Sequence, residues 1–404
     1  MRGLAWALCL LALAAGTPAA WAQADPAKPV VDPNGLLAPV LPPDMLDGTR
    51  IYRQFREGLA APDCQPQSTD AQWQRHFSHA PERLADREDD ILPLFGYVVG
   101  VMRDAGLPTE FALIPFVESG YHPGASSTAG PAGLWQFVSL TARNHGVRMR
   151  RGYDGRLSPV DSTLAAARYL KTLHGMFGGD WRLAVMAYNA GENRVLQATK
   201  RGGVSAGTAR PPRLPGLSRN TVAYVEKLHA LACTLEQAGE RPAWLAALQR
   251  PVPRLQPLEL PSDFGTLSAW AQREGHDVDQ LAGLNPALSR LRGAPAGGPL
   301  WVLAPAPDGA APPISAADLI RGSDSARNGD PDAPFLTRRR DQDSTPDSHT
   351  VVRGDTLSSI AKRYGVRTQQ LLQWNRLKPR ALIKPGMVLV LADPARRDDI
   401  APPR

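Results

Sequence analysis

Apolar and polar residues alternate with a helical period over most of the segment 51–240. In 88–105, EDDILPLFGYVVGVMRDA, the apolar residues recur at the spacing of one helix face. Two further helices are predicted, each beginning at a capping side chain, Ser158 or Asp180, and each ending before a glycine. The pattern therefore predicts a mainly α-helical domain over 51–240.

Two C-terminal segments repeat each other. The stretch 265–285 aligns with 355–375 without a gap, at a constant offset of 90 residues. Each stretch has helical spacing, and each lies between short apolar runs that are typical of strands, such as LWVLA after the first copy and MVLVLA after the second. A repeat at a fixed offset indicates one unit used twice. We therefore predict strand–helix–helix–strand modules at 253–305 and 349–393.

Two segments lack the apolar content of a folded domain. Residues 23–50 are rich in proline and are predicted to be a flexible tether. Residues 306–348 are rich in Pro, Asp, Gly, Ser and Arg and are predicted to be a disordered linker. The predicted architecture is multidomain, with a mainly α domain followed by two small α+β modules.

The N-terminus has the pattern of a secretory signal. Residues 1–22 contain one arginine, an apolar stretch and then Ala20-Trp21-Ala22, so we expect cleavage after Ala22. Cys9 follows a leucine within the apolar stretch, which is not the setting of a lipid-attachment cysteine. No later segment has the length and apolarity of a membrane span. We expect an exported, periplasmic protein, and membrane association stays open.

Charge and cysteine content narrow the chemistry. The formal net charge is +7, which suits an anionic partner, but no dense basic block with interleaved aromatics favours nucleic acid. Cys64 and Cys233 remain after signal cleavage, and in an oxidising compartment they form either one disulfide or two buried thiols. No His or Cys spacing is typical of a metal site, so neither a metal nor a cofactor is expected.

A single carboxylate stands out in FVESGYHPGASSTAGPAGLWQF, residues 116–137. Glu118 is the only acid in this stretch, and the apolar run before it predicts a helix that ends near it. The partial negative charge of a helix C-terminus and the apolar neighbours Phe116 and Trp135 would both favour the protonated acid. A general acid that works at neutral pH needs such a raised pKa.

The second repeat resembles a LysM domain, a family that binds glycans containing N-acetylglucosamine, such as peptidoglycan. The resemblance rests on V-x-x-G-D-T-L-x-x-I-A, W-N and K-P-G-x-x-L. The first repeat is similar but has Gly265 where the second has Asp355, and it lacks a counterpart of the K-P-G turn, so its glycan binding stays open. The resemblance implies glycan binding in the second copy by Gly354, Asp355, Thr356, Asn375, Pro385 and Gly386.

The helical domain resembles the lytic murein transglycosylases of the soluble-lytic-transglycosylase superfamily, of the membrane-bound D type, which have a lysozyme-like fold. Three motifs carry the resemblance in order: ALIPFVESGYHP, AGPAGLWQF and MAYNAGENRV. It implies that Glu118 is the catalytic acid and base. By the same resemblance, the substrate is bound by Ser119, Gln136, Tyr188 and Asn189.

The resemblance also implies why one acid suffices. Glycosidases commonly need two carboxylates, but substrate-assisted enzymes use the N-acetyl group of the sugar in place of one of them. Glu118 would protonate the oxygen between N-acetylmuramic acid and N-acetylglucosamine, and the acetamide oxygen would attack C1. Glu118 would then take a proton from the C6 hydroxyl, which closes a 1,6-anhydro ring.

Other interpretations stay open. The domain could be a hydrolytic muramidase, with one of the loop acids as a base, or a non-catalytic peptidoglycan-binding protein. Several single residues also have simpler explanations. Tyr188 could be a satisfied core tyrosine and Asn189 a helix cap, while Glu192 is expected to be solvated or structural. The remaining acids of the domain, Asp154, Asp161 and Asp180, are expected to serve turns and caps. Endo or exo cleavage, stem preference, oligomeric state and regulation are not determined by the sequence.

Overall fold

The computed structural model describes residues 41–307, apart from 65–68, 129, 204–213 and 294–298. In the C-terminal region it describes residues 348–351, 356–357, 360–361, 366, 368–375, 377, 381, 383 and 386–391. The chain forms two compact units, residues 1–327 and 328–404. The expected signal peptide, residues 23–40 of the tether and residues 308–347 of the linker lie outside the described residues.

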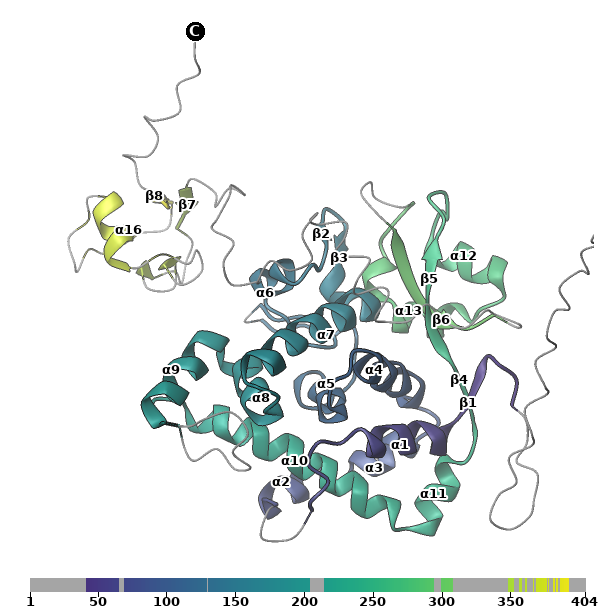
Figure 1. Ribbon diagram of the computed structural model, residues 1–404. Helices are drawn as coiled ribbons and strands as arrows, with labels where there is room; N and C mark the ends of the chain where they lie inside the picture. The colour runs from purple at the N-terminus through teal and green to yellow at the C-terminus, as the bar shows by residue number, and fades with distance from the viewer. Residues whose placement is uncertain are drawn as a thin grey trace, which may run out of the picture. The chain divides into compact units, whose positions relative to one another are not determined.

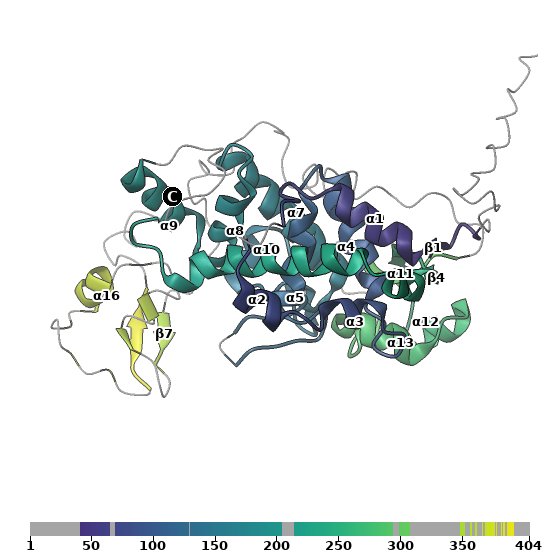
Figure 2. The same cartoon turned by 90° about the horizontal axis from the view of Figure 1, so that it is seen from below.

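The first unit consists mainly of helices, as the apolar periodicity predicts (Figure 1). The short helix α5 lies among α4, α7, α8 and α10, and α10 runs along the side that Figure 2 shows. The helices are α1 (Gly48–Glu57), α2 (Ala71–His76), α3 (Ala80–Ala85), α4 (Leu92–Asp104), η1 (Thr109–Leu113), α5 (Ile114–Glu118), α6 (Ser139–Asn144), η2 (Gly155–Leu157), α7 (Pro159–Met176), α8 (Trp181–Ala190), α9 (Glu192–Gly202), α10 (Arg219–Gly239) and α11 (Pro242–Leu248).

The predicted helix starts are found at the predicted residues. Ser158 Oγ accepts from the backbone N–H of Asp161 at 3.2 Å at the start of α7. Asp180 caps α8 by accepting from the N–H groups of Arg182 and Leu183. Within α4, Leu92, Phe95, Val99 and other apolar residues on the same side are fully buried in the main core. Spacing of three to four residues places these side chains on one face, which is why the segment is a core helix.

The prediction of a flexible tether over 23–50 is wrong for residues 45–50, which form a strand and the start of a helix. Strand β1 (Met45–Asp47) pairs antiparallel with β4 (Pro251–Pro253), and α1 begins at Gly48. The side chain of Asp47 caps α1 by accepting from Thr49 N at 2.7 Å. A strand of three residues is too short to leave a periodic pattern, so the composition of the surrounding proline-rich segment hid it.

The first repeat has the predicted strand–helix–helix–strand order. We call residues 253–305 the first module. Its strands pair antiparallel, from Leu255 opposite Pro305 to Leu260 opposite Leu300. The elements are β5 (Leu255–Leu260), α12 (Leu267–Glu274), α13 (Val278–Leu284), η3 (Pro286–Leu288) and β6 (Leu300–Pro305).

The first module is part of the helical unit rather than an independent domain. Leu303 of β6 is fully buried in the same core as the helices, and Leu255, Leu284 and Trp301 pack against that core. In return, Tyr153 of the short hairpin β2 (Met149–Arg150) and β3 (Tyr153–Asp154) is buried in the module's own core. The two parts therefore share buried surface on both sides of their junction.

The second unit contains the second module, residues 349–393. Strand β7 (Ser348–Thr350) pairs antiparallel with β8 (Val388–Val390), and α16 (Thr368–Trp374) packs beside them. A separate small core contains Val351, Ile360, Ala361, Leu371, Leu389 and Leu391. The described elements are those that the repeat predicts.

A disulfide joins Cys64 to Cys233 of α10. The two cysteines are 169 residues apart in sequence, so the bond closes a loop that contains most of the helical domain. A cross-link across a long loop restricts the unfolded chain and so stabilises the folded one.

We predict that replacing both residues, Cys64→Ala with Cys233→Ala, lowers the free energy of unfolding by about 2–4 kcal/mol. Urea unfolding with and without reductant measures this. Reductant should destabilise the unsubstituted chain and leave the double variant unchanged. Equal stability of the unsubstituted protein and the double variant in the absence of reductant would contradict the prediction.

Candidate active site

Glu118 is the last residue of α5, as the sequence predicts. The N–H of the following residue, Ser119, makes the last helical bond, to Pro115 O at 3.0 Å, and Gly120 beyond it has a left-handed φ of 60°. The carboxyl group is partly buried, and its Oε1 accepts a short hydrogen bond from the hydroxyl of Tyr224 on α10. The site is therefore built from two helices that lie far apart in the sequence.

Burial shifts the pKa of this acid upwards. Desolvation raises the pKa of Glu118 above its ordinary value, while the hydrogen bond from Tyr224 and the positive charge of Lys227 oppose that rise. The shift is toward the protonated form, which is the direction that a general acid requires. The sequence-based expectation relied partly on the helix C-terminus, whereas in the structure burial is the largest cause.

Two neutral tyrosines accompany Glu118. Burial raises the pKa of Tyr188 and of Tyr224 well above the ordinary tyrosine value, and the nearby Glu118 charge acts in the same direction. Both side chains therefore remain hydroxyl donors at any physiological pH. Tyr224 was missed by the sequence analysis. The helical pattern of 219–239 places it one turn from Lys227, but nothing in that pattern distinguishes it from a core tyrosine.

Tyr188 bonds to the backbone of the loop that follows Glu118. Its hydroxyl donates to the carbonyl of Trp135 at 2.7 Å. The Trp135 ring is fully buried, and its Nε1 donates to Thr163 Oγ1 at 3.0 Å. The predicted AGPAGLWQF motif therefore contributes a fixed backbone beside the acid, with its tryptophan anchored in the core.

Ser119 and Gln136 bond to the same loop. Ser119 Oγ donates to Leu134 O at 2.8 Å, and Gln136 Nε2 donates to Gly133 O at 2.8 Å. Gln136 has a left-handed φ of 46°, which turns the chain sharply after Trp135. In the ligand-free structure both side chains thus fix the loop's shape. Substrate contacts by these two residues remain a proposal.

Gly133 and Arg156 lock the loop against the body of the domain. Gly133 has a φ of 81°, and a Cβ atom there would lie 1.7 Å from the carbonyl oxygen of Arg156, so only glycine fits. The buried Arg156 guanidinium donates through Nη1 to Gly130 O at 2.7 Å and to Phe137 O at 3.1 Å. These contacts hold both ends of the loop in place.

The remaining acids named from the sequence have other partners. Glu192 Oε2 accepts from the Tyr169 hydroxyl at 3.1 Å. Asp154 is ion-paired with Arg156 at 2.7 Å, and Asp161 accepts from the Tyr153 hydroxyl at 3.0 Å. Asn189 is exposed at the end of α8, next to the glycine where that helix stops. The structure thus brings Glu118, Ser119, Gln136 and Tyr188 around one loop, with Asn189 on the surface.

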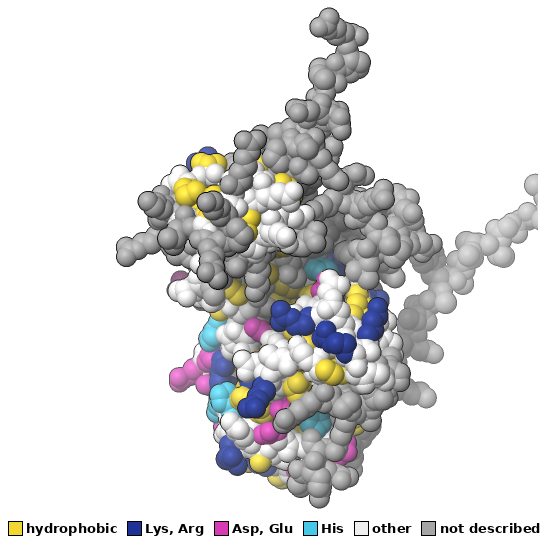
Figure 3. Space-filling model, turned by 90° about the vertical axis from the view of Figure 1, so that its left-hand side faces the viewer, with side chains coloured by type: hydrophobic (Ala, Val, Ile, Leu, Met, Phe, Trp, Pro, Cys, Tyr) yellow, Lys and Arg dark blue, Asp and Glu magenta, His cyan; other side chains and the backbone are white. Residues whose placement is uncertain are grey.

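Within the described residues, no group of His, Cys, Asp and Glu side chains could hold a metal ion. Among the described helices, none has the length and apolarity to cross a membrane. On the face that Figure 3 shows, Lys and Arg side chains lie among acidic, histidine and uncharged ones.

The expected glycan-binding residues of the second module are only partly described. Gly354, Asp355 and Pro385 lie outside the described residues, while Thr356 and Gly386 are exposed. The Asn375 amide bonds to backbone, since Nδ2 donates to Val390 O at 2.8 Å and Oδ1 accepts from Val390 N. Asn285 makes the same pair of bonds to Leu303 in the first module. The repeated asparagine therefore ties the last strand of each module to its second helix.

Comparison with known proteins assigns the two parts of the chain. Residues 102–208 match the family described as Transglycosylase SLT domain, and residues 349–392 match LysM domain. The chain is thus similar to a transglycosylase SLT domain over 102–208 and to a LysM domain over 349–392.

Named relatives agree with this assignment. The membrane-bound lytic murein transglycosylase D of Escherichia coli is 35% identical over 306 residues, which are 74% of this chain and 63% of that protein. The chain thus spans less than two thirds of that relative's length. A putative soluble lytic murein transglycosylase of Haemophilus influenzae is 30% identical over 103 residues, which are 24% of this chain and 17% of that protein. A putative tributyltin chloride resistance protein of Alteromonas is 41% identical over 106 residues, 26% of this chain and 51% of that protein.

We predict that Tyr224→Phe moves the alkaline limb of the pH–activity profile to higher pH. In the unsubstituted protein, the hydrogen bond from Tyr224 lowers the pKa of Glu118. Without that bond the pKa of Glu118 rises, and the acid stays protonated to a higher pH. The maximal rate should fall about 10- to 100-fold, because the carboxylate formed during the reaction loses a donor. Tyr169→Phe, which removes a hydroxyl bonded to Glu192 instead, should leave the limb in place; an unshifted limb in Tyr224→Phe would contradict the assignment.

We predict that Asn375→Ala acts on stability before it acts on glycan recognition. The change leaves the backbone of Val390 without its side-chain partner, which should cost about 1–3 kcal/mol of the second unit's folding free energy. Thermal unfolding followed by circular dichroism measures this, and Asn285→Ala should destabilise the first unit in the same way. Weaker glycan binding with unchanged stability would contradict the structural role.

Proposed function

We propose that the protein is an exported peptidoglycan lytic transglycosylase. It would cleave the β-1,4 bond between N-acetylmuramic acid and N-acetylglucosamine without water and leave 1,6-anhydro-N-acetylmuramic acid ends. The observation that carries the proposal is a single carboxyl group, Glu118, whose pKa is raised by burial and which lies beside two neutral tyrosine hydroxyls within an SLT domain. Two relatives carry the name lytic murein transglycosylase, which supports murein, that is peptidoglycan, as the substrate.

The geometry supports a reaction with one acid that acts twice. Protonated Glu118 gives its proton to the glycosidic oxygen, while the acetamide oxygen of the muramic sugar attacks C1 and the C1–oxygen bond breaks. The Tyr224 hydroxyl then donates to the new carboxylate and stabilises its charge. This carboxylate takes the proton of the C6 hydroxyl, whose oxygen bonds to C1 as the acetamide oxygen leaves. Glu118 is protonated again, and no cofactor takes part.

The loop residues would shape the sugar site. Ser119 and Tyr188 fix the backbone of Leu134 and Trp135 beside the acid, and Gln136 sets the turn after them. On this proposal, Gln136 and the exposed Asn189 contact the glycan once it is bound. The LysM domain at 349–392 would hold peptidoglycan near the site and so raise the local substrate concentration.

We predict that Glu118→Gln loses at least about 100-fold of the activity on purified peptidoglycan, because glutamine cannot transfer the proton. Mass spectrometry of the soluble muropeptides identifies the reaction. The unsubstituted protein should release products lighter by one water than reducing-end muropeptides. Glu192→Gln, an acid of the same domain that bonds to Tyr169, should retain activity.

Two outcomes would overturn the proposal. Reducing-end muropeptides from the unsubstituted protein would make it a hydrolytic muramidase that needs a second acid. Equal turnover by Glu118→Gln would remove Glu118 from the mechanism. Absence of products from the unsubstituted protein would favour a peptidoglycan-binding protein without activity.

A further inference from the structure

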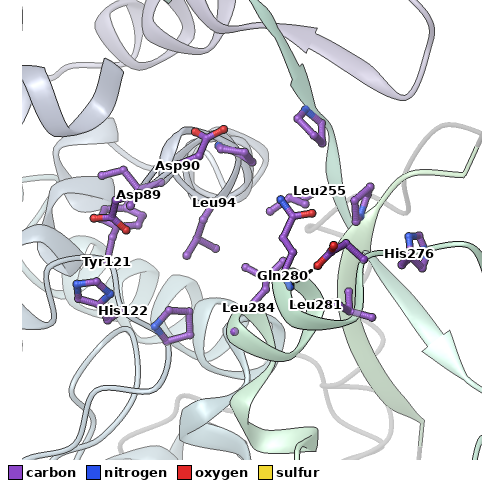
Figure 4. Close-up of a pocket in the computed structure, with 17 residues that line it drawn as sticks. Asp89, Asp90, Leu94, Tyr121, His122, Leu255, His276, Gln280, Leu281 and Leu284 are labelled. Atoms are coloured by element: carbon purple, nitrogen blue, oxygen red, sulfur yellow. Dashed lines mark hydrogen bonds between the residues drawn. The ribbon is translucent and has the colours of Figure 1, made fainter. Parts of the chain in front are cut away.

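A cavity of about 220 Å³ lies within the first unit, at the junction of the helical domain and the first module. The start of α4 and the residues just after Glu118 form one wall, and β5 and α13 form the other. Figure 4 shows Tyr121, His122 and Leu94 on the first wall and Gln280, Leu281 and Leu284 on the second. Neither repeat-based nor motif-based reasoning predicts it, because it exists only where the two parts meet.

The cavity is preformed. Its two walls belong to one compact unit with shared buried surface, since Leu255 and Leu284 pack against the core that contains Leu94. Strand β4, which is paired with β1, leads directly into β5, and β5 forms part of the wall. Binding of a ligand would therefore not require the free-energy cost of ordering the cavity walls.

The lining combines an apolar floor with a polar rim. Leu94 and Leu281 are buried, and Leu255 and Leu284 are partly buried. The rim carries exposed side chains that can hydrogen-bond, namely Asp89, His122, Asp277 and Gln280. An apolar surface with a few convergent polar groups is the usual composition of a small-ligand site.

The rim is connected to the catalytic loop. His122 follows Glu118 by four residues. Arg83 Nη2 donates to Asp89 Oδ2 at 2.9 Å and to the carbonyl of Gly120 at 3.1 Å. A ligand in the cavity thus touches the same short segment that carries the proposed acid.

The rim charges select against anions. Asp90 is neutralised by Arg250, with contacts of 2.7 and 3.0 Å, and Asp89 is partly neutralised by Arg83. Asp277 forms no salt bridge with a described basic residue, and its Oδ1 caps α13 by accepting from Gln280 N. The net charge at the rim is negative, so the carboxylates of a peptide stem would be repelled, whereas sugar hydroxyls would find acceptors.

We propose that this cavity binds a neutral N-acetylglucosamine unit of a glycan strand that lacks peptide stems. The site rests on the proposed function for its substrate class. The volume is below the roughly 300–1,000 Å³ of sites for drug-sized ligands, so it suits a single sugar ring. The leucine floor suits the acetamide methyl group and the apolar face of the ring.

The cavity wall does not contain the counterparts of Asp355 and Thr356, two of the expected LysM glycan residues. At the offset of 90 residues, Asp355 and Thr356 correspond to Gly265 and Thr266. Neither Gly265 nor Thr266 is part of the cavity wall. The first module would therefore bind sugar through its junction with the helical domain.

Gly283→Trp tests the site by filling it. Gly283 lies in α13 and on the cavity wall, and a Cβ atom there would have no neighbour within 4 Å, so a side chain can begin there without a clash. Replacing a glycine inside a helix also does not weaken the helix. Gln272→Trp on the exposed surface of α12, outside the cavity, is the matched control.

The probe is chitotriose that carries a photoreactive diazirine, applied to the full chain with Glu118→Gln so that no turnover occurs. Labelled peptides are mapped by mass spectrometry. We expect label on peptides containing 121–123 or 276–284, reduced at least tenfold by Gly283→Trp and unchanged by Gln272→Trp. Label on 349–392 is the internal reference and should be equal in all three proteins.

Absence of label at the junction, or equal label with Gly283→Trp, would overturn the proposal. Displacement by muramyl dipeptide at lower concentration than by unlabelled chitotriose would overturn the neutral-sugar assignment. Asp277→Asn, which keeps a capping side chain but removes the charge, should narrow the preference for chitotriose over muramyl dipeptide severalfold. Because none of these readouts requires turnover, failure of the site and failure of the transglycosylase proposal are distinguishable.

Discussion

Burial of one carboxyl group is the constraint on which the site depends. Glu118 is held at the end of α5 against α10, where desolvation raises its pKa and the Tyr224 hydroxyl limits that rise. The opposition is useful for an acid that must both give and take a proton, since too high a pKa would make a poor proton donor. Packing of α10 against α5 holds the two partners together.

The loop after Glu118 is fixed from several directions. Its backbone accepts hydrogen bonds from Ser119 just after α5, from Tyr188 of α8 and from Arg156 of η2. Because Gly133 has no side chain, the loop backbone can lie close to the carbonyl of Arg156 in η2. Motif residues that are expected to touch substrate therefore also build the ligand-free site, so a loss of activity on their substitution would not separate the two roles.

Sequence predicted the helices, the repeat and the acid, because each leaves a local pattern. Glu118 at a helix end and the caps Ser158 and Asp180 are found where the pattern places them. Tyr224 could not be predicted, since its role comes from contact between residues 106 positions apart. The pairing of β1 with β4 was missed because a strand of three residues leaves no periodic pattern. Fusion of the first module with the helical unit depends on Leu303 and Tyr153 crossing a junction that no periodicity marks.

The account requires that Glu118 be protonated well above the pH at which an ordinary glutamic acid ionises. Carbon-13 NMR of the full chain with labelled glutamate carboxyls, assigned by comparison with Glu118→Gln, measures this pKa directly. The account predicts a pKa above the ordinary value of about 4.3. A pKa at or below that value would mean that Glu118 is ionised at neutral pH, and would contradict its role as the general acid.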